Sequence, residues 1–155
     1  MGSLPEEILK ILEENGVDFE VREFSSETHS ASDAAKALNC PLQRIVKSIV
    51  VEKQNKDFCL FLIRGDHHLN IESFKRKGIN IKRLANPVKV QNITGFPVGG
   101  TPPFGHKNKI ETFIDESLLK FPELWFGGGK KNVLFKIKSR DLLKCCPDGV
   151  VIDLE

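Results

Sequence analysis

Long apolar runs are missing from this chain of 155 residues. Its uncharged apolar stretches, such as those at residues 45–46 and 48–51, are far shorter than the roughly 18 residues that a membrane-spanning helix needs. The first residues have no basic segment leading into an apolar run, so the sequence does not indicate a secretory signal. Repeats and low-complexity tracts are absent as well. We therefore expect a cytoplasmic protein that makes no membrane contact.

Cysteine and histidine are too scattered to indicate a metal site. Two cysteines are isolated and two are adjacent, at Cys40, Cys59, Cys145 and Cys146. None has the spacing that is typical of zinc ligands. His67 and His68 are neighbours, so on a strand they would point to opposite faces and could not share one ion. We expect the cysteines to be buried as small hydrophobic side chains, and we expect no metal and no cofactor.

What the sequence does contain indicates a single compact domain over residues 1–155. Hydrophobic residues make up 40% and charged residues 28%, a balance that argues against disorder, and the length suits one core. The residue patterns predict helices over residues 5–15, 30–38, 71–77, 86–93 and 139–144, and strands over residues 19–23, 44–53, 57–64, 110–114, 124–126, 133–137 and 150–154.

Two features of this pattern indicate the fold. Three polar residues join the strands at residues 44–53 and 57–64, which predicts a hairpin at the centre of the sheet. Strands and helices alternate irregularly, which favours an α/β or α+β fold with a mixed sheet over a doubly wound parallel sheet. Residues 80–84 fit either a strand or a loop, and either Ser30 or Ser32 could cap the second helix.

Charge is distributed unevenly along the chain. Residues 1–35 carry nine acidic and two basic side chains, whereas residues 36–155 carry twelve acidic and twenty-one basic ones. Residues 67–109 hold eight basic side chains and one acidic one. If part of this segment forms one face, it would attract the phosphate backbone of RNA, and a solvated lysine surface is the alternative. Its densest part consists of Lys75, Arg76 and Lys77.

The most unusual segment covers residues 94–106, with four glycines and three prolines. Prolines fix φ and glycines allow close approach, so a stiff loop of this kind can offer bare backbone N–H groups to an anion. A second glycine turn could do the same. For both segments a purely structural loop is the alternative, and neither has the spacing of a P-loop or a dinucleotide fingerprint. The second turn consists of Gly127, Gly128 and Gly129, followed by Lys130.

Lys47 interrupts the largely apolar stretch at residues 45–51. Strand alternation places it on one face with Ile45 and Ile49, and places Val46 and Ser48 on the other face. A lysine that points into a cleft can hold an oxyanion or a carbonyl oxygen, or act as a base when burial lowers its pKa. The alternative is a lysine that extends to water from an edge strand.

These segments together resemble the YbaK-like family of trans-editing aminoacyl-tRNA deacylases, which is related to the insertion domain of bacterial prolyl-tRNA synthetase. The resemblance spans nearly the whole chain and implies a compact α/β fold with a curved mixed sheet flanked by helices. It also implies an active pocket beside the lysine strand, where a wrongly attached amino acid is hydrolysed from tRNA. It rests on residues 45–48, 94–96, 99–106, 114–118, 126–130 and 139–143.

The resemblance also implies roles for individual residues. Lys47 matches the family's functional lysine, which we expect to position the ester or the terminal ribose and to stabilise charge. Backbone N–H groups of Gly99, Gly100 and Thr101 would stabilise the tetrahedral oxyanion. No nucleophile constellation is evident, so water, activated by the substrate itself, is the expected nucleophile.

Further residues would form the rest of the binding site. Asp115 and the glycine turn with Lys130 would shape the pocket or hold the terminal adenosine. His106 would touch the same region, and a histidine that anchors the loop is the alternative. Lys75, Arg76 and Lys77 are the expected contacts with tRNA phosphates.

The family precedents for the substrate are alanine and cysteine on tRNA(Pro), so we expect a small amino acid. Binding alone separates amino acids that differ by one methylene by only roughly 1–3 kcal/mol, which is why a second hydrolytic site is needed. No appended synthetase domain is visible, so we expect a free-standing carboxylic ester hydrolase at the acceptor end, with an aminoacyl-tRNA synthetase as a partner and no DNA. The alternatives are a non-catalytic module that binds tRNA or a nucleotide beside a synthetase, and a hydrolase of free aminoacyl esters.

Overall fold

The computed structural model describes residues 4–28 and 30–154. Its strands are β1 (Glu20–Glu23), β2 (Val46–Lys53), β3 (Phe58–Arg64), β4 (Ile81–Leu84), β5 (Glu111–Asp115), β6 (Glu123–Gly127), β7 (Val133–Lys138) and β8 (Val150–Ile152). Its helices are α1 (Glu6–Glu14), α2 (Ala31–Leu38), α3 (Ile71–Arg76), α4 (Pro87–Thr94) and α5 (Ser139–Cys145), with short 3₁₀ helices η1 (Leu42–Arg44) and η2 (Glu116–Lys120). These elements confirm the predicted order, and the segment that the sequence left open as strand or loop is strand β4.

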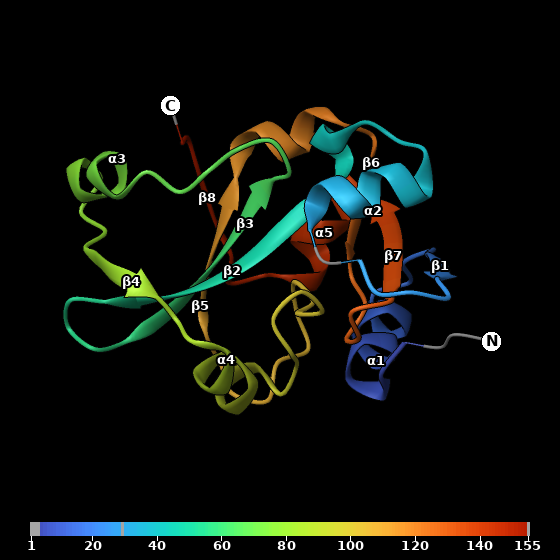
Figure 1. Ribbon diagram of the computed structural model, residues 1–155, viewed down its shortest axis with the longest axis horizontal. Coiled ribbons are helices and arrows are strands. Elements are labelled where there is room, and N and C mark those ends of the chain that lie inside the picture. The colour runs from blue at the N-terminus through green and yellow to red at the C-terminus, as the bar shows by residue number, and fades with distance from the viewer. Residues whose placement is uncertain (1–3, 29, 155) are drawn as a thin grey trace.

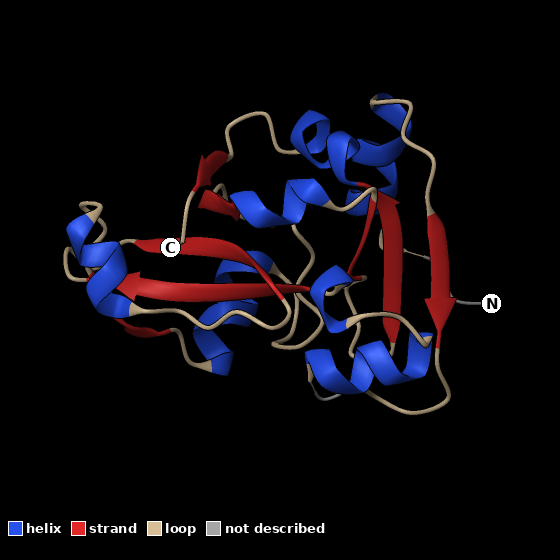
Figure 2. Cartoon of the chain, turned by 90° about the horizontal axis from the view of Figure 1, so that it is seen from above, coloured by secondary structure: helices blue, strands red, loops and turns tan. Residues whose placement is uncertain are grey.

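The strands form two sheets, of order β1-β7-β6 and β4-β2-β3-β5-β8. The β2–β3 hairpin is antiparallel, whereas β5 pairs in parallel with both β3 and β8. The larger sheet is therefore mixed, with the hairpin strand β3 at its centre, as the residue pattern predicts. The hairpin runs obliquely along the long axis of the molecule (Figure 1), and the strands of the two sheets run in different directions (Figure 2).

The largest hydrophobic core joins the two sheets. Its buried side chains come from β2 and β3 of one sheet, from β6 and β7 of the other, and from helices α1 and α5. In α1, Ile8 and Leu12 are fully buried, because residues four apart lie on the same face of a helix. Phe61 and Phe74 belong to a second cluster on the opposite face of the larger sheet, beneath α3.

Helix α2 covers the junction between the two sheets. Its N-cap is Ser30, whose hydroxyl accepts a hydrogen bond from the Asp33 amide at 3.0 Å, so Ser30 and not Ser32 caps the helix. Ala34 packs with Ile45 and Leu134 in a third buried cluster. Small alanine side chains let the helix approach the sheet junction closely.

Strand β2 has an open edge next to α2. β4 pairs with β2 only across Val51–Lys53, and the start of β2 meets the smaller sheet through a single bridge from Ile45 to Trp125. Residues 46–49 therefore have β3 on one side and no strand partner on the other, within the described part of the chain. A cavity lies at this edge.

The cysteines lie largely where the sequence predicts. Cys59, Cys145 and Cys146 are buried and Cys40 is half-buried, and all four are unpaired thiols. None of the helices in the described ranges has the length and apolar character required to cross a bilayer.

Candidate functional site

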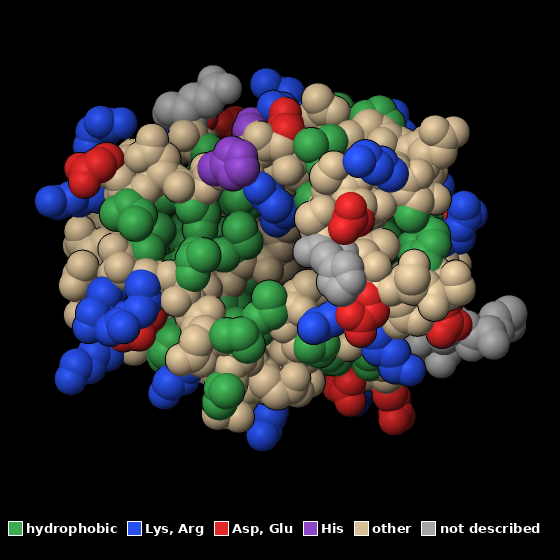
Figure 3. Space-filling model, in the orientation of Figure 1, with side chains coloured by type: hydrophobic (Ala, Val, Ile, Leu, Met, Phe, Trp, Pro, Cys, Tyr) green, Lys and Arg blue, Asp and Glu red, His purple; other side chains and the backbone are tan. Residues whose placement is uncertain are grey.

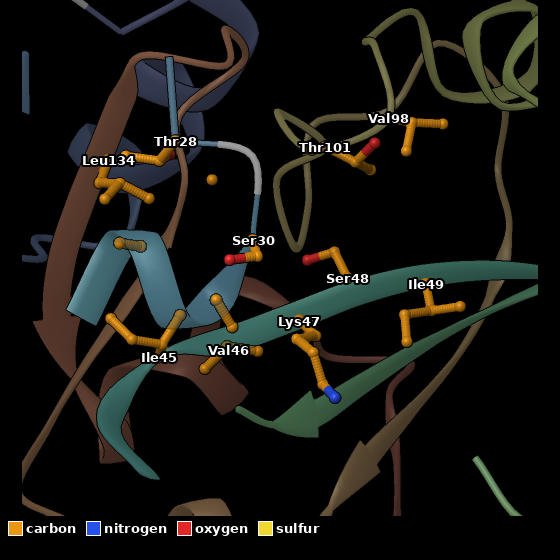
Figure 4. Close-up of a pocket in the computed structure, with 14 residues that line it drawn as sticks. Thr28, Ser30, Ile45, Val46, Lys47, Ser48, Ile49, Val98, Thr101 and Leu134 are labelled. Carbon is orange, nitrogen blue, oxygen red and sulfur yellow. The ribbon is translucent and has the colours of Figure 1, made fainter. Parts of the chain in front are cut away.

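A cavity of about 230 Å³ lies at the open edge of β2. Ala31 and Ala34 of α2, together with Ile45 and Leu134, give it apolar walls, and Val98 closes it from the loop that follows α4. Figure 4 shows this arrangement, and in the space-filling view the molecule is hollowed on this face between hydrophobic side chains (Figure 3). The cavity is smaller than the roughly 300–1,000 Å³ typical of pockets for drug-sized ligands, so it suits a small group.

Lys47 reaches the cavity from β2 and is half-buried. Its Nζ donates a hydrogen bond to the backbone carbonyl of His67. Burial lowers the pKa of the Lys47 ammonium, and the Asp66 carboxylate opposes that shift. Lys47 and Ser48 leave the strand in opposite directions (Figure 4), and both residues line the cavity.

Ser48 lies on the other side of this edge, turned toward the loop that carries Thr101 (Figure 4). Its Oγ is buried and has no hydrogen-bond partner among the described residues. A buried hydroxyl without a partner costs about 1–3 kcal/mol, so its position in the cavity needs a reason. Sequence reasoning gave Ser48 no role, although a hydroxyl in an otherwise apolar strand was the available signal.

The loop at residues 97–101 forms a tight turn over the cavity. The Gly100 amide donates to the Pro97 carbonyl at 3.0 Å, and the Thr101 hydroxyl donates to the same oxygen at 2.9 Å. Gly99 adopts a left-handed φ of 85°, which glycine tolerates without strain. Of the three predicted oxyanion donors, Gly100 is thus engaged within the turn, whereas Gly99 and Thr101 line the cavity.

The second glycine turn supports this loop through direct backbone contact. The Gly129 amide donates to the Gly100 carbonyl at 2.8 Å. A Cβ on Gly100 would lie 2.9 Å from the backbone of Lys130, closer than real Cβ atoms come. Only Gly127 of this turn lines the cavity, because Gly128 packs against Val133 and Leu4, Gly129 packs against Pro5, and the Lys130 side chain is exposed.

Asp115 is buried behind Lys47 and does not line the cavity. Its carboxylate accepts hydrogen bonds from the Arg64 amide at 3.0 Å, from His67 Nδ1 at 2.7 Å and from the Ser117 hydroxyl at 2.6 Å. Burial alone would raise the pKa of Asp115, but these donors outweigh it and lower that pKa. The carboxylate thus reaches Lys47 only through His67, a residue that the sequence suggested only as an improbable metal ligand.

His106 lies away from the Lys47 cavity. Its Nε2 donates to the Pro102 carbonyl at 2.7 Å, and it borders a separate cavity of about 730 Å³ that Cys145 and Cys146 also line. Burial lowers the pKa of His106, and the bond to Pro102 opposes that shift. These contacts are those of a histidine that anchors the loop.

One basic residue lies next to the Lys47 cavity, whereas the predicted tRNA contacts lie far from it. Lys131, with Pro87 and Gln91 of α4, lines a further cavity of about 340 Å³. This cavity shares Thr28, Val98 and Gly99 with the first one. The predicted tRNA contacts are exposed and belong to α3 or follow it directly, and α3 lies at the end of the larger sheet far from α2 (Figures 1 and 2). They are Lys75, Arg76 and Lys77.

In residues 4–28 and 30–154, no three His, Cys, Asp or Glu side chains gather in a way that could hold a metal ion.

Comparisons with known proteins identify close relatives of this arrangement. The family model described as "Aminoacyl-tRNA editing domain" matches residues 25–145. The proline–tRNA ligase of Herminiimonas arsenicoxydans is 32% identical over 130 residues, which are 79% of this chain and 22% of the ligase. Protein YwhH of Bacillus subtilis, which is uncharacterized, is 25% identical over 87% of this chain and 86% of its own length.

Two solved structures share the whole fold. One is of a protein regarded as a candidate trans-editing enzyme for prolyl tRNA synthetase, with a TM-score of 0.83 and 33% identity over 97% of this chain and 98% of that one. The other is hypothetical protein APE2540, with a TM-score of 0.85 and 30% identity over 96% of this chain and 98% of that one.

Proposed function

This chain belongs to the aminoacyl-tRNA editing domain family, and we propose that it hydrolyses the ester bond of tRNA charged with the wrong small amino acid. The observation that carries the proposal is the cavity at the open edge of β2, where Lys47 lies on one side and the Gly99 to Thr101 turn on the other. Its volume of about 230 Å³ and its apolar walls suit alanine or cysteine, and tRNA(Pro) is the proposed carrier.

The two sides of the strand edge suggest how the ester lies. The amino acid side chain occupies the space between α2, Ile45 and Leu134, and the ester carbonyl faces the turn. Thr101 and Gly99 then offer backbone N–H groups to the oxyanion that forms during hydrolysis. Lys47, whose ammonium lies across the strand from Ser48, holds the terminal ribose and stabilises the charge that develops during hydrolysis.

Water is the proposed nucleophile. No cysteine lines the cavity, and burial raises the pKa of the Cys59 and Cys146 thiols to about 12, so neither is a thiolate at neutral pH. The hydrogen bond from Lys47 to the His67 carbonyl favours electrostatic binding over nucleophilic attack, because it engages the ammonium. The substrate's own ribose hydroxyl or α-amine activates the water.

The tRNA leaves the Lys47 cavity along the adjoining cavity of about 340 Å³, past Lys131 and α4. Single-stranded acceptor nucleotides fit this route, because exposed apolar side chains at Val88 and Val98 accompany the basic side chain of Lys131. We propose that Lys75, Arg76 and Lys77 contact phosphates farther along the tRNA, that Asp115 holds His67 behind Lys47, and that His106 anchors the loop through the Pro102 carbonyl. We also propose that the enzyme is cytoplasmic and acts in trans beside an aminoacyl-tRNA synthetase. The relatives of similar length support the action in trans.

Hydrolysis of mischarged tRNA tests the proposal. tRNA(Pro) carrying alanine, cysteine, serine or proline is incubated with the protein, and the matching free aminoacyl esters are incubated in parallel. The proposal expects loss of one small amino acid from tRNA and little turnover of free esters. Tight tRNA binding without hydrolysis would support the non-catalytic module instead, and equal turnover of free esters would support the small-molecule hydrolase.

A further inference from the structure

We propose that His67, fixed by Asp115, is a positioning residue that sets where the Lys47 ammonium lies beside the cavity. This inference rests on the proposed function, because it assigns a role in the same hydrolysis. His67 is not among the residues that line the cavity, so it acts through Lys47 and not on the substrate.

Two hydrogen bonds of His67, one made by its ring and one by its backbone carbonyl, connect the buried carboxylate to the ammonium. Asp115 Oδ2 is 2.7 Å from His67 Nδ1, and the His67 carbonyl accepts the hydrogen bond from Lys47 Nζ. The Asp115 side chain is only 2% exposed, whereas that of His67 is 20% exposed. One end of this connection is therefore anchored in the core, and the other end is Lys47, which lines the cavity.

The anchor itself is held from several sides. Asp115 Oδ2 also accepts from the Arg64 amide at 3.0 Å. Its Oδ1 accepts from the Ser117 amide at 3.0 Å and from the Ser117 hydroxyl at 2.6 Å. A carboxylate with this many donors cannot rotate without losing several bonds at once, so the imidazole of His67 has one well-defined partner.

The backbone that carries the His67 carbonyl is also fixed. The His67 amide donates to the Arg64 carbonyl at 2.8 Å, and the Arg64 side chain pairs with Asp66 at 2.6 Å. Between them, Gly65 has no room for a side chain, because a Cβ there would lie 2.3 Å from the Leu42 carbonyl oxygen. The turn thus sits tightly against the segment that leads into β2, on which Lys47 lies.

A fixed carbonyl matters because lysine is flexible. Its four-carbon stem has many rotamers, and fixing them during the reaction would slow it. An ammonium that is already in place when the ester binds requires no free energy of reorganisation during the reaction. The His67 ring is thus expected to affect catalysis while leaving substrate binding almost unchanged.

A double-mutant cycle on deacylation tests this role. His67→Ala is expected to lower kcat by about tenfold, the equivalent of about 1.4 kcal/mol or one hydrogen bond, with KM within about twofold of wild type. In a Lys47→Ala background the same change should cost nothing further, because the residue on which it acts is gone. His68→Ala, at the exposed neighbouring position, is the matched control and should match wild type.

A conservative variant and a second readout keep the test independent of activity. His67→Asn places an amide N–H near the position of Nδ1 and should restore most of kcat. In ¹⁵N-labelled protein, the Lys47 ammonium resonance, assigned by its loss in Lys47→Arg, should be observable in wild type and His67→Asn and be broadened by exchange in His67→Ala. If wild type hydrolyses no aminoacyl-tRNA, the proposed function fails while this signal still tests the positioning. An unchanged Lys47 signal in His67→Ala, or a tenfold loss of kcat in both backgrounds, would overturn the inference.

Discussion

The backbone of Gly127 lies directly against the carbonyl oxygen of Thr101, since a Cβ on Gly127 would be only 2.9 Å from that oxygen. Gly127 ends β6, and Thr101 ends the turn that covers the cavity. The wall of the cavity is thus formed by two backbone segments in contact, and its shape depends on the absence of a side chain at one position.

Gly127→Ala should therefore damage both stability and activity. The added methyl group pushes the loop at residues 97–101 away from the end of β6. Overpacking of this kind costs about 1–3 kcal/mol in free energy of unfolding. Displaced loop N–H groups should lower kcat/KM by roughly tenfold or more, as measured by single-turnover deacylation. Gly16→Ala is the control, because Gly16 has a φ of 63° and no atom near its added Cβ. It should lose stability through backbone strain and keep full activity, and equal activity losses in the two variants would contradict the account.

Ser48→Ala should raise the free energy of unfolding by about 1 kcal/mol, because the buried Ser48 hydroxyl has no partner in the described structure. Chemical denaturation measures this change. Ser117→Ala is the comparison, since its hydroxyl donates to the buried Asp115 carboxylate at 2.6 Å, and its loss should destabilise the protein by about 1.5–3 kcal/mol. Similar destabilisation by both variants would show that Ser48 has a partner.

The stability of the protein should depend on His106 below neutral pH. Burial lowers the pKa of His106 in the folded protein, so the unfolded chain takes up the proton more readily. The stability that the neutral ring provides is complete above the unfolded value of about 6.5 and decreases as pH falls below it. The His106→Gln variant retains an N–H for the Pro102 carbonyl and should lose less stability between pH 7 and pH 5 than wild type. Parallel unfolding curves for the two proteins would contradict this prediction.

Replacing Lys75, Arg76 and Lys77 together by alanine should weaken tRNA binding and reduce its salt dependence. Each lost phosphate contact lowers the slope of log K against log salt by about 0.9, so three contacts would lower it by about 2.7. Filter binding at several salt concentrations measures the slope. A triple replacement of Lys120, Lys138 and Arg140, exposed residues outside the basic segment, should leave the slope unchanged, and an unaltered slope in the first variant would indicate a solvated surface.

Local patterns predicted much of the fold because they arise from local physics. Alternation along β2 and β3 and the polar turn between them gave the hairpin and its place in the sheet. The same alternation predicted that Lys47 and Ser48 point to opposite faces, as Figure 4 shows.

Contacts between distant segments could not be read from the sequence. Asp115 and His67 are 48 positions apart, and no local pattern links them. The glycine turn was expected to bind a ligand, but Gly128 and Gly129 serve a close backbone approach that only the folded structure reveals. Charge density along the chain found the basic residues of α3 without indicating that α3 lies far from the cavity.

Single-turnover hydrolysis by Lys47→Met tests the central claim most directly. The burial that lowers the pKa of Lys47 disfavours its charge, so this variant should stay folded with a Tm at least equal to that of wild type. If Lys47 holds the ester end of aminoacyl-tRNA, the rate of hydrolysis should fall by about 10²–10³-fold. Lys53→Met is the control: it alters a lysine paired with Glu111 at 2.9 Å and should keep the wild-type rate. Hydrolysis at the wild-type rate by a folded Lys47→Met protein would contradict the account.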